Sequence, residues 1–271
     1  MADALGGRTI LVTRPQHQAD EFARCILAAG GTPLKFPSMV IEPARAASEL
    51  DAALLRLDQH DLVIFVSANA VFETRARLAA GGGASLRDIA IAAAPGPGTA
   101  AALREAGVKR VLAPIERFDS EGLLAQIDLE GLTPSRVLLL RGEGNGRDWL
   151  ADALRGRGAA VDVVACYRRR RATPDARALR ALLDGPVPDA ITITSAEGGA
   201  YLLDMLGGSA IAWINRAPVF VPHANIAARL GALGVRGVRV TAGGDAGLVR
   251  GLIDHFKCLP FKCLPFKCPP S

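Results

Sequence analysis

The chain has few aromatic residues, few cysteines and no long apolar run. Aromatic residues make up 5% of the 271 residues, and only two of them are tyrosines. No apolar run reaches the ~18 residues that a membrane-spanning helix needs. The N-terminus also lacks the charged-then-apolar layout of a signal peptide. These absences argue against a membrane or exported protein, and we expect a cytoplasmic one.

Cysteine and histidine are too sparse and too scattered to suggest a metal site or a disulfide framework. Of five cysteines, Cys25 and Cys166 are isolated and the other three lie close to the C-terminus. An unpaired set of this kind fits a reducing compartment. The four histidines show no metal-ligand spacing: His17, His60, His223 and His255.

The formal net charge of +5 is small, and three of the positive charges are Lys257, Lys262 and Lys267 near the C-terminus. The rest of the chain is therefore only mildly basic, which does not point to nucleic acid. Elsewhere Lys35 and Lys109 are the only lysines, and arginine supplies the other positive charges. The arginine fork suits carboxylates, although a GC-rich genome explains the same bias and is preferred on composition alone.

Short apolar runs alternate with helical patterns along the whole chain. Continuous runs of this kind are typical of parallel strands that are buried on both faces. Alternating strands and helices predict an α/β architecture with parallel sheets. The expected strands are Thr9–Thr13, Leu62–Val66, Ile89–Ala94, Val111–Leu112, Val137–Leu140, Val161–Tyr167, Ala190–Thr194, Val219–Val221 and Val238–Val240.

These units repeat at long range, which predicts two similar lobes with a ligand cleft between them. A nearly constant spacing over most of the chain is hard to obtain by chance. The matching segments are 127 or 128 positions apart: Ile10–Arg14 with Val137–Arg141, Gly31 with Gly158, Asp61 with Asp189, Ser67 with Ser195, and Gly107 with Gly234.

Polar residues and glycine loops follow the expected strands, where open α/β sheets bind ligands. Glycines in the loops Pro95–Thr99 and Gly142–Gly146 allow backbone N–H groups to approach an anion at the positive end of a helix. We therefore expect an anionic ligand. Glycines that merely make tight turns, and serines that merely cap helices, remain alternatives. The polar residues at strand ends are Arg14, Ser67, Asn69, Arg141, Ser195 and His223.

Familiar catalytic motifs are missing. Neither glycine loop is followed by Lys-Ser/Thr, and the serines lack the G-x-S-x-G elbow of hydrolases. Tyr167 is more informative, because it ends a strand-like run that we expect to cross between the lobes and to face the cleft. A tyrosine packed on a hinge is the alternative. The following Arg168–Arg171 run is more typical of a solvated face than of a binding patch.

Taken together, several motifs resemble those of the uroporphyrinogen-III synthase family, over about residues 8–256. Each motif is weak alone, but their order and spacing are specific. Asn225 and Ile226 depart from the family, since some relatives have threonines there. The motifs are Leu11–Pro15, Asp61 with Phe65–Val71, Gly96–Ala100 with Gly107, Leu139–Arg147, Gly158 with Tyr167–Arg168, Thr194–Ser195, and Pro222–His223 with Ile226–Ala227.

The resemblance implies two α/β lobes, with parallel sheets flanked by helices, joined by a two-stranded linker around a substrate cleft. One lobe would contain residues 1–36 and 171–256, and the other residues 37–170. Residues 257–271 form a five-residue repeat rich in cysteine and proline, which we expect to be disordered. Soft-metal binding by Cys258, Cys263 and Cys268 is a remote alternative.

The family's substrate is hydroxymethylbilane, a linear tetrapyrrole with eight carboxylates, and no cofactor is needed. The resemblance implies that the chain is a monomeric lyase of haem biosynthesis, which closes this substrate with inversion of ring D through a spiro intermediate. Tyr167 matches the family tyrosine thought to assist departure of the hydroxyl. Hydroxymethylbilane synthase would be the partner that delivers the substrate. Substrate contacts are expected from Arg14, Ser67, Asn69, Gly98, Thr99, Arg141, Gly142, Ser195, His223 and Asn225.

Two rival functions remain open at this stage. One is a two-lobed binding protein for another anion, although such proteins usually carry export signals. The other is a synthase-like interaction domain without activity, against which the presence of Tyr167 argues. Both rivals predict that hydroxymethylbilane would not be converted to the type III isomer.

Overall fold

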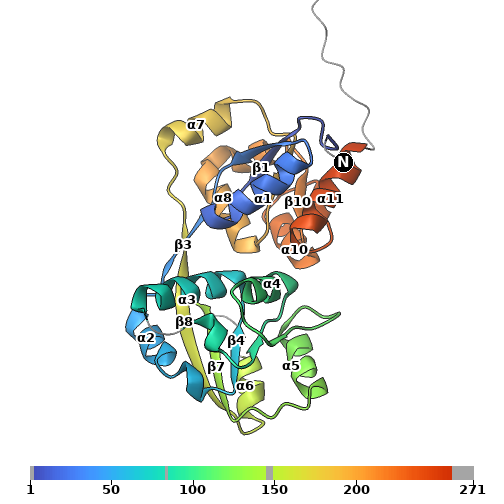
Figure 1. Ribbon diagram of the computed structural model, residues 1–271. Coiled ribbons are helices and arrows are strands. Elements are labelled where there is room, and N and C mark those ends of the chain that lie inside the picture. Colours follow the sequence, from blue (N-terminus) through green and yellow to red (C-terminus); the bar gives the residue numbers. More distant parts are fainter. Residues whose placement is uncertain (1–2, 83–84, 145–148, 258–271) are drawn as a thin grey trace, which may run out of the picture. The chain divides into compact units, whose positions relative to one another are not determined.

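The chain divides into two compact units in the computed structural model, which describes residues 3–82, 85–144 and 149–257 (Figure 1). Unit 1 consists of Met1–Val40 and Arg171–Ser271, and unit 2 of Ile41–Arg170. The chain thus leaves unit 1 after Val40, whereas the resemblance suggested that it leaves after Phe36. It returns to unit 1 after Arg170, as the resemblance suggested. None of the described helices is long and apolar enough to cross a bilayer.

Unit 1 is built on a five-stranded sheet in the order β11-β10-β9-β1-β2, and all four neighbouring pairs of strands are parallel. The central strands are short, apolar and buried, as the sequence predicted. The strands are β1 (Thr9–Val12), β2 (Thr32–Lys35), β9 (Ala190–Thr192), β10 (Val219–Val221) and β11 (Val238–Val240).

Helices cover both faces of the unit 1 sheet, because alternate strand residues point to opposite sides. Ile10 and Val12 pack with one pair of helices, while Leu11 faces the others. The first face carries α1 (Gln16–Ala28) and α11 (Gly244–Lys257). The second carries α7 (Ala176–Asp184), α8 (Ala196–Leu206), α9 (Ala210–Ile214) and α10 (Ala224–Ala232).

Unit 2 has a six-stranded sheet in the order β3-β8-β7-β4-β5-β6. The pairings from β8 to β6 are parallel. The expected strand at Ile89–Ala94 is shorter than predicted. The strands are β3 (Met39–Pro43), β4 (Leu62–Phe65), β5 (Ala92–Ala93), β6 (Val111–Leu112), β7 (Arg136–Gly142) and β8 (Ala160–Arg171).

The unit 2 sheet is also covered on both faces. Val63 and Phe65 belong to one core, and Leu62 and Ile64 to the other. The first core is closed by α2 (Ala47–Leu54), α3 (Ala68–Gly81) and α4 (Pro97–Glu105). The second is closed by α5 (Ser120–Leu129) and α6 (Trp149–Arg155).

The two sheets share one topology, which explains the 127- to 128-residue spacing in the sequence. Along the sheets, β11-β10-β9-β1-β2 corresponds to β6-β5-β4-β7-β8. Two aspartates at matching positions accept equivalent backbone hydrogen bonds, one in each unit. Asp61 accepts hydrogen bonds from the N–H groups of Ser135 and Arg136 at 2.8 and 2.9 Å, and Asp189 accepts one from Thr9 at 2.9 Å. Each carboxylate thus holds the first residues of the neighbouring strand.

The Asp61 carboxylate makes folding stability depend on pH. The backbone N–H of Arg136, followed by that of Ser135, holds the pKa of Asp61 below its ordinary value. A lowered folded-state pKa stabilises the fold above the unfolded pKa of about 3.9, and this contribution is lost as the pH falls through the folded value. We expect Asp61→Asn to lower the urea midpoint at pH 7, by an amount that shrinks as the pH falls below the unfolded pKa of about 3.9. Asp58→Asn is the control, because the Asp58 carboxylate accepts no hydrogen bond from the described residues. An equal loss in both variants would contradict the assignment.

The chain passes between the units within β3 and at the end of β8, and these strands are neighbours in the sheet order. The N–H of Ala172 donates to the carbonyl of Ser38 at 3.0 Å, just beyond the paired strands. Two adjacent strands therefore form the connection, and the end of β8 is the segment that carries Tyr167.

Candidate functional site

The carboxyl edge of the unit 2 sheet gathers most of the residues that the sequence singled out. Because β8, β7, β4 and β5 are parallel neighbours, their carboxyl ends lie along one edge. The residues at or just after these ends are Tyr167 on β8, Arg141 and Gly142 on β7, Ser67 and Asn69 after β4, and Gly98 and Thr99 after β5.

Tyr167 is fully buried, and its hydroxyl joins two polar side chains. The hydroxyl oxygen lies 2.9 Å from Ser67 Oγ, and it accepts a hydrogen bond from Arg169 Nη2 at 2.8 Å. The Arg169 guanidinium carbon also lies 5.2 Å from the centre of the tyrosine ring. The ring thus packs in the core of unit 2, with its hydroxyl bonded on both sides, and a catalytic role of Tyr167 stays a prediction.

Gly142 makes this arrangement possible by leaving room for the tyrosine ring. To reach Ser67 from β8, the side chain of Tyr167 must pass over β7, which lies between β8 and β4. A methyl group at Gly142 would lie 2.7 Å from Cζ of Tyr167 and 3.0 Å from its hydroxyl oxygen. The structure therefore gives Gly142 a packing role, whereas a direct contact with substrate stays a prediction. Asn145 and Gly146 of the same loop lie outside the described residues.

A bulge in β8 turns Tyr167 toward the core. Arg141 pairs with Ala165 but Gly142 pairs with Tyr167, so Cys166 is an extra residue between them. If β8 alternated regularly through Cys166, Tyr167 would point to the opposite face from Val164. The Cys166 thiol donates to the carbonyl of Arg141 at 3.2 Å, and burial raises its pKa to about 12. Cys166 therefore has the character of a structural thiol and not of a nucleophile.

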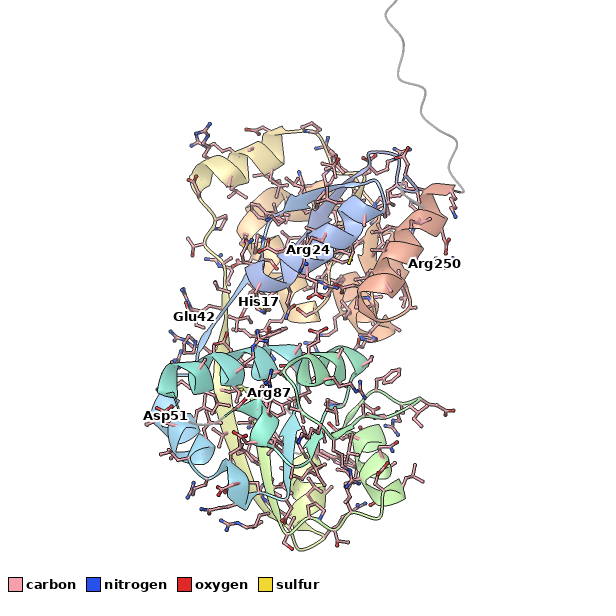
Figure 2. All side chains as sticks on the ribbon, in the orientation of Figure 1. His17, Arg24, Glu42, Asp51, Arg87 and Arg250 are labelled. Carbon is pink, nitrogen blue, oxygen red and sulfur yellow. The ribbon has the colours of Figure 1, made fainter. Side chains whose placement is uncertain are left out.

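The Arg168–Arg171 run is not simply a solvated face. Arg168 and Arg170 both pair with Glu42 of β3, at 2.8 and 2.6 Å, and Glu42 is labelled in Figure 2. Arg171 pairs with Asp204. Since alternate residues of a strand face opposite sides, Arg168 and Arg170 reach Glu42 while Arg169 turns to Tyr167. The expectation of a purely solvated run is thus corrected for Arg169.

The serine and glycine positions of this edge are helix N-termini. Ser67 caps α3, where its Oγ accepts from the N–H of Ala70 at 3.3 Å, and Asn69 lies in the first turn. Gly96 precedes α4 and provides no side-chain cap. Gly98 has open space where a side chain would project, and Thr99 is buried beside it in the first turn of α4. The α4 N-terminus therefore keeps backbone donors that its own cap residue does not accept.

Unit 1 repeats this arrangement at its own carboxyl edge. Ser195 caps α8 and accepts from the N–H of Gly198 at 3.0 Å, as Ser67 does in α3. His223 precedes α10 without a side-chain cap, as Gly96 does in α4, and both His223 and Asn225 are exposed. The expected helix-cap role of the two serines is confirmed, and their contact with substrate stays a prediction.

Arg14, just after β1, interacts with an acidic and an aromatic side chain of the same unit. Its guanidinium pairs with Asp245 at 2.6 Å and stacks on the ring of Phe22, with 4.5 Å between the guanidinium carbon and the ring centre. These contacts tie the end of β1 to the start of α11. The matching Arg141 is partly exposed at the end of β7.

A model of the family described as "Uroporphyrinogen-III synthase HemD" matches residues 20–244, which is most of the chain. The chain belongs to the uroporphyrinogen-III synthase family. Curated uroporphyrinogen-III synthases are similar to it over part of its length. The Synechococcus elongatus protein is 35% identical over 165 residues, covering 60% of this chain and 61% of that protein. The Escherichia coli protein is 32% identical over 166 residues, covering 59% and 65%. These alignments thus span less than two thirds of either relative.

Solved structures of uroporphyrinogen-III synthases share the fold. The Helicobacter pylori structure has a TM-score of 0.61 and 16% identity, and covers 92% of this chain and 99% of its own. A mutant Thermus thermophilus structure has a TM-score of 0.54 and 22% identity, with coverage of 92% and 97%. At these identities the likeness concerns the two-lobed α/β fold alone, which confirms the fold class expected from the sequence.

Arg169 of this uroporphyrinogen-III synthase family chain was not predicted as a site residue. The residue was hidden in a run of four arginines, where any single one looked like surface charge. The available signal was strand alternation: a residue two positions after Tyr167 shares its face. Using that signal would have required knowing that β8 continues beyond Tyr167 as a paired strand.

Proposed function

We propose that the chain is a uroporphyrinogen-III synthase that cyclises hydroxymethylbilane to uroporphyrinogen III. The observation that carries the proposal is the hydroxyl of Tyr167, held between Ser67 and Arg169 at the carboxyl edge of unit 2, in a chain of this family. The same edge is where parallel α/β sheets bind their ligands.

In the proposed first step the phenol of Tyr167 hydrogen-bonds the departing hydroxyl of ring A. The C–O bond breaks with its electron pair on oxygen, while the pyrrole nitrogen supplies the pair that forms the exocyclic double bond. The N–H proton of that pyrrole balances the proton that converts hydroxide to water, so an azafulvene and water result. Tyr167 donates a hydrogen bond during the step and keeps its own proton at the end.

Ring D then attacks through its already substituted carbon and forms a spiro intermediate, whose fragmentation and reclosure invert the ring. Without enzyme the symmetric type I isomer forms. The protein's main contribution is therefore to hold the two ends of the substrate in one reactive geometry. The cleft inferred from the duplication stays a prediction.

We propose that helix N-termini bind the substrate carboxylates. The first turns of α4 and α10 follow cap residues, Gly96 and His223, whose side chains accept none of the helix N–H groups. Such N-termini attract anions through free donors and the helix dipole. Gly98, Thr99 and Asn225 lie in these turns, and Arg14 and Arg141 at nearby strand ends are the proposed side-chain contacts.

One assay separates the proposal from its rivals. Hydroxymethylbilane is supplied to the purified chain, and the isomers formed are resolved by chromatography. We expect the type III isomer to replace type I. Type I product alone would exclude the synthase, and a separate measurement of substrate binding would then distinguish an anion-binding protein from an inactive interaction domain.

Location and partner are the finer parts of the proposal. We propose a cytoplasmic enzyme that receives hydroxymethylbilane from hydroxymethylbilane synthase. Neither location nor direct transfer affects the isomer assay, which uses the free substrate.

The Cys/Pro repeat at residues 257–271 is expected to be dispensable. Apart from Lys257, which ends α11, these residues lie outside the described chain. Because every proposed contact lies at or before Asn225, deleting residues 257–271 should leave the rate of type III formation within about twofold of the full chain. A clear loss of rate would show that the repeat takes part in activity.

A further inference from the structure

We infer that Arg169 is a positioning residue that fixes the direction of the Tyr167 hydroxyl; the inference rests on the proposed function. A phenol has one hydrogen to donate and lone pairs that accept, while a guanidinium can only donate. Arg169 Nη2 lies 2.8 Å from the phenol oxygen, so on this side the oxygen must accept.

On the other side Ser67 Oγ lies at 2.9 Å, and the inference assigns the phenol hydrogen to that contact because Arg169 already occupies a lone pair of the phenol oxygen. Ser67 Oγ also accepts from the N–H of Ala70 at 3.3 Å, which keeps it at the start of α3. In this arrangement Arg169 holds the oxygen and the hydrogen points toward the carboxyl edge of β4. This hydrogen is the one that the proposed first step needs for the leaving hydroxyl of the substrate.

The placement of Arg169 is a consequence of strand geometry. The bulge at Cys166 turns Tyr167 toward the core, and regular alternation then carries Arg169 to the same side, with its guanidinium against the ring at 5.2 Å. Arg170, the next residue, faces away and pairs with Glu42. Arg169 is thus the arginine of the run that hydrogen-bonds the phenol. Because its guanidinium is charged, this hydrogen bond is stronger than one from a neutral donor.

The test uses the small number of tyrosines in the chain. Tyr167 and Tyr201 are the only two, so Tyr201→Phe leaves Tyr167 as the sole source of the tyrosine Raman doublet, whose intensity ratio reports whether the phenol donates or accepts. In that background we expect Arg169→Met to shift the doublet toward a phenol that only donates. We also expect it to lower kcat about tenfold to a hundredfold, with KM changed less than about threefold. Arg169→Lys can still donate a hydrogen bond, so it should restore part of the parent's doublet ratio and part of its kcat.

Arg170→Met is the matched control, since it removes an arginine of the same strand that does not contact Tyr167. It should leave the doublet and kcat close to those of the parent. An unchanged doublet in Arg169→Met, or an unchanged kcat, would overturn the inference. Failure of the parent protein to form the type III isomer would instead refute the proposed function, and the doublet would still report whether Arg169 holds the phenol.

Discussion

Tyr167→Phe is expected to lower the turnover of hydroxymethylbilane about a hundredfold or more while the protein stays folded. The change removes only the hydroxyl, so the ring continues to fill the core of unit 2 against Gly142. The lost hydrogen bonds to Ser67 and Arg169 cost about 1–3 kcal/mol of stability at most. The chemical step loses the donor that assists departure of the hydroxyl, which is worth about 10²–10⁴ in rate. Rate and urea midpoint are measured on the same preparation.

Tyr201→Phe is the matched control for this variant. It removes the same atom from the only other tyrosine, whose hydroxyl bonds to Glu197 at 3.0 Å on the surface of α8. We expect turnover and stability both to remain close to those of the parent. Unchanged turnover in Tyr167→Phe would remove this hydroxyl from the mechanism and would leave positioning of the substrate as the main source of catalysis.

Gly142→Ala is expected to damage both stability and turnover, through the same tyrosine. The added methyl group would lie 2.7 Å from Cζ and 2.8 Å from Cε2 of Tyr167, so the buried ring must move. Overpacking of this kind typically costs about 1–3 kcal/mol. A displaced ring also separates its hydroxyl from Ser67, and a misplacement near 1 Å can lower turnover about a hundredfold. The free energy of unfolding and the rate of type III formation are the two measurements.

Gly81→Ala provides the control for the same substitution without the clash. Gly81 ends α3 and has open space where the methyl group would project. Replacement of a helical glycine with alanine should raise stability by up to about 1 kcal/mol and leave turnover unchanged. If Gly142→Ala were equally harmless, the ring of Tyr167 would have room to move, and the packing role of Gly142 would be wrong.

Much of the architecture could be predicted because it depends on local pattern. Short apolar runs such as Leu62–Val66 predict strands that are buried on both faces, and β4 has this character. The repeat spacing predicted two similar units, because an aspartate and a serine recur at matching places in each. Asp61 and Asp189 hold neighbouring strands, and Ser67 and Ser195 cap matching helices. These roles need only a residue type at a fixed place beside a strand or helix.

The site itself was only partly predictable. Tyr167, Ser67 and Gly142 were each predicted as site residues. Nothing in the sequence indicated that the ring of Tyr167 passes over Gly142 to reach Ser67. That contact needs three strands in the order β8-β7-β4, and a bulge at Cys166 that turns the side chain toward the core. Arg169 was missed for the same reason, since its direction depends on where the alternation of β8 is interrupted.

The α/β class, the duplication, the helix caps and the family could all be predicted from residue type and spacing along the chain. The partners of the Tyr167 hydroxyl could not, because its hydrogen bonds to Ser67 and Arg169 depend on strand order and register. A shift of one residue in the pairing of β8 would turn Tyr167 to the other face of the sheet and separate the three groups.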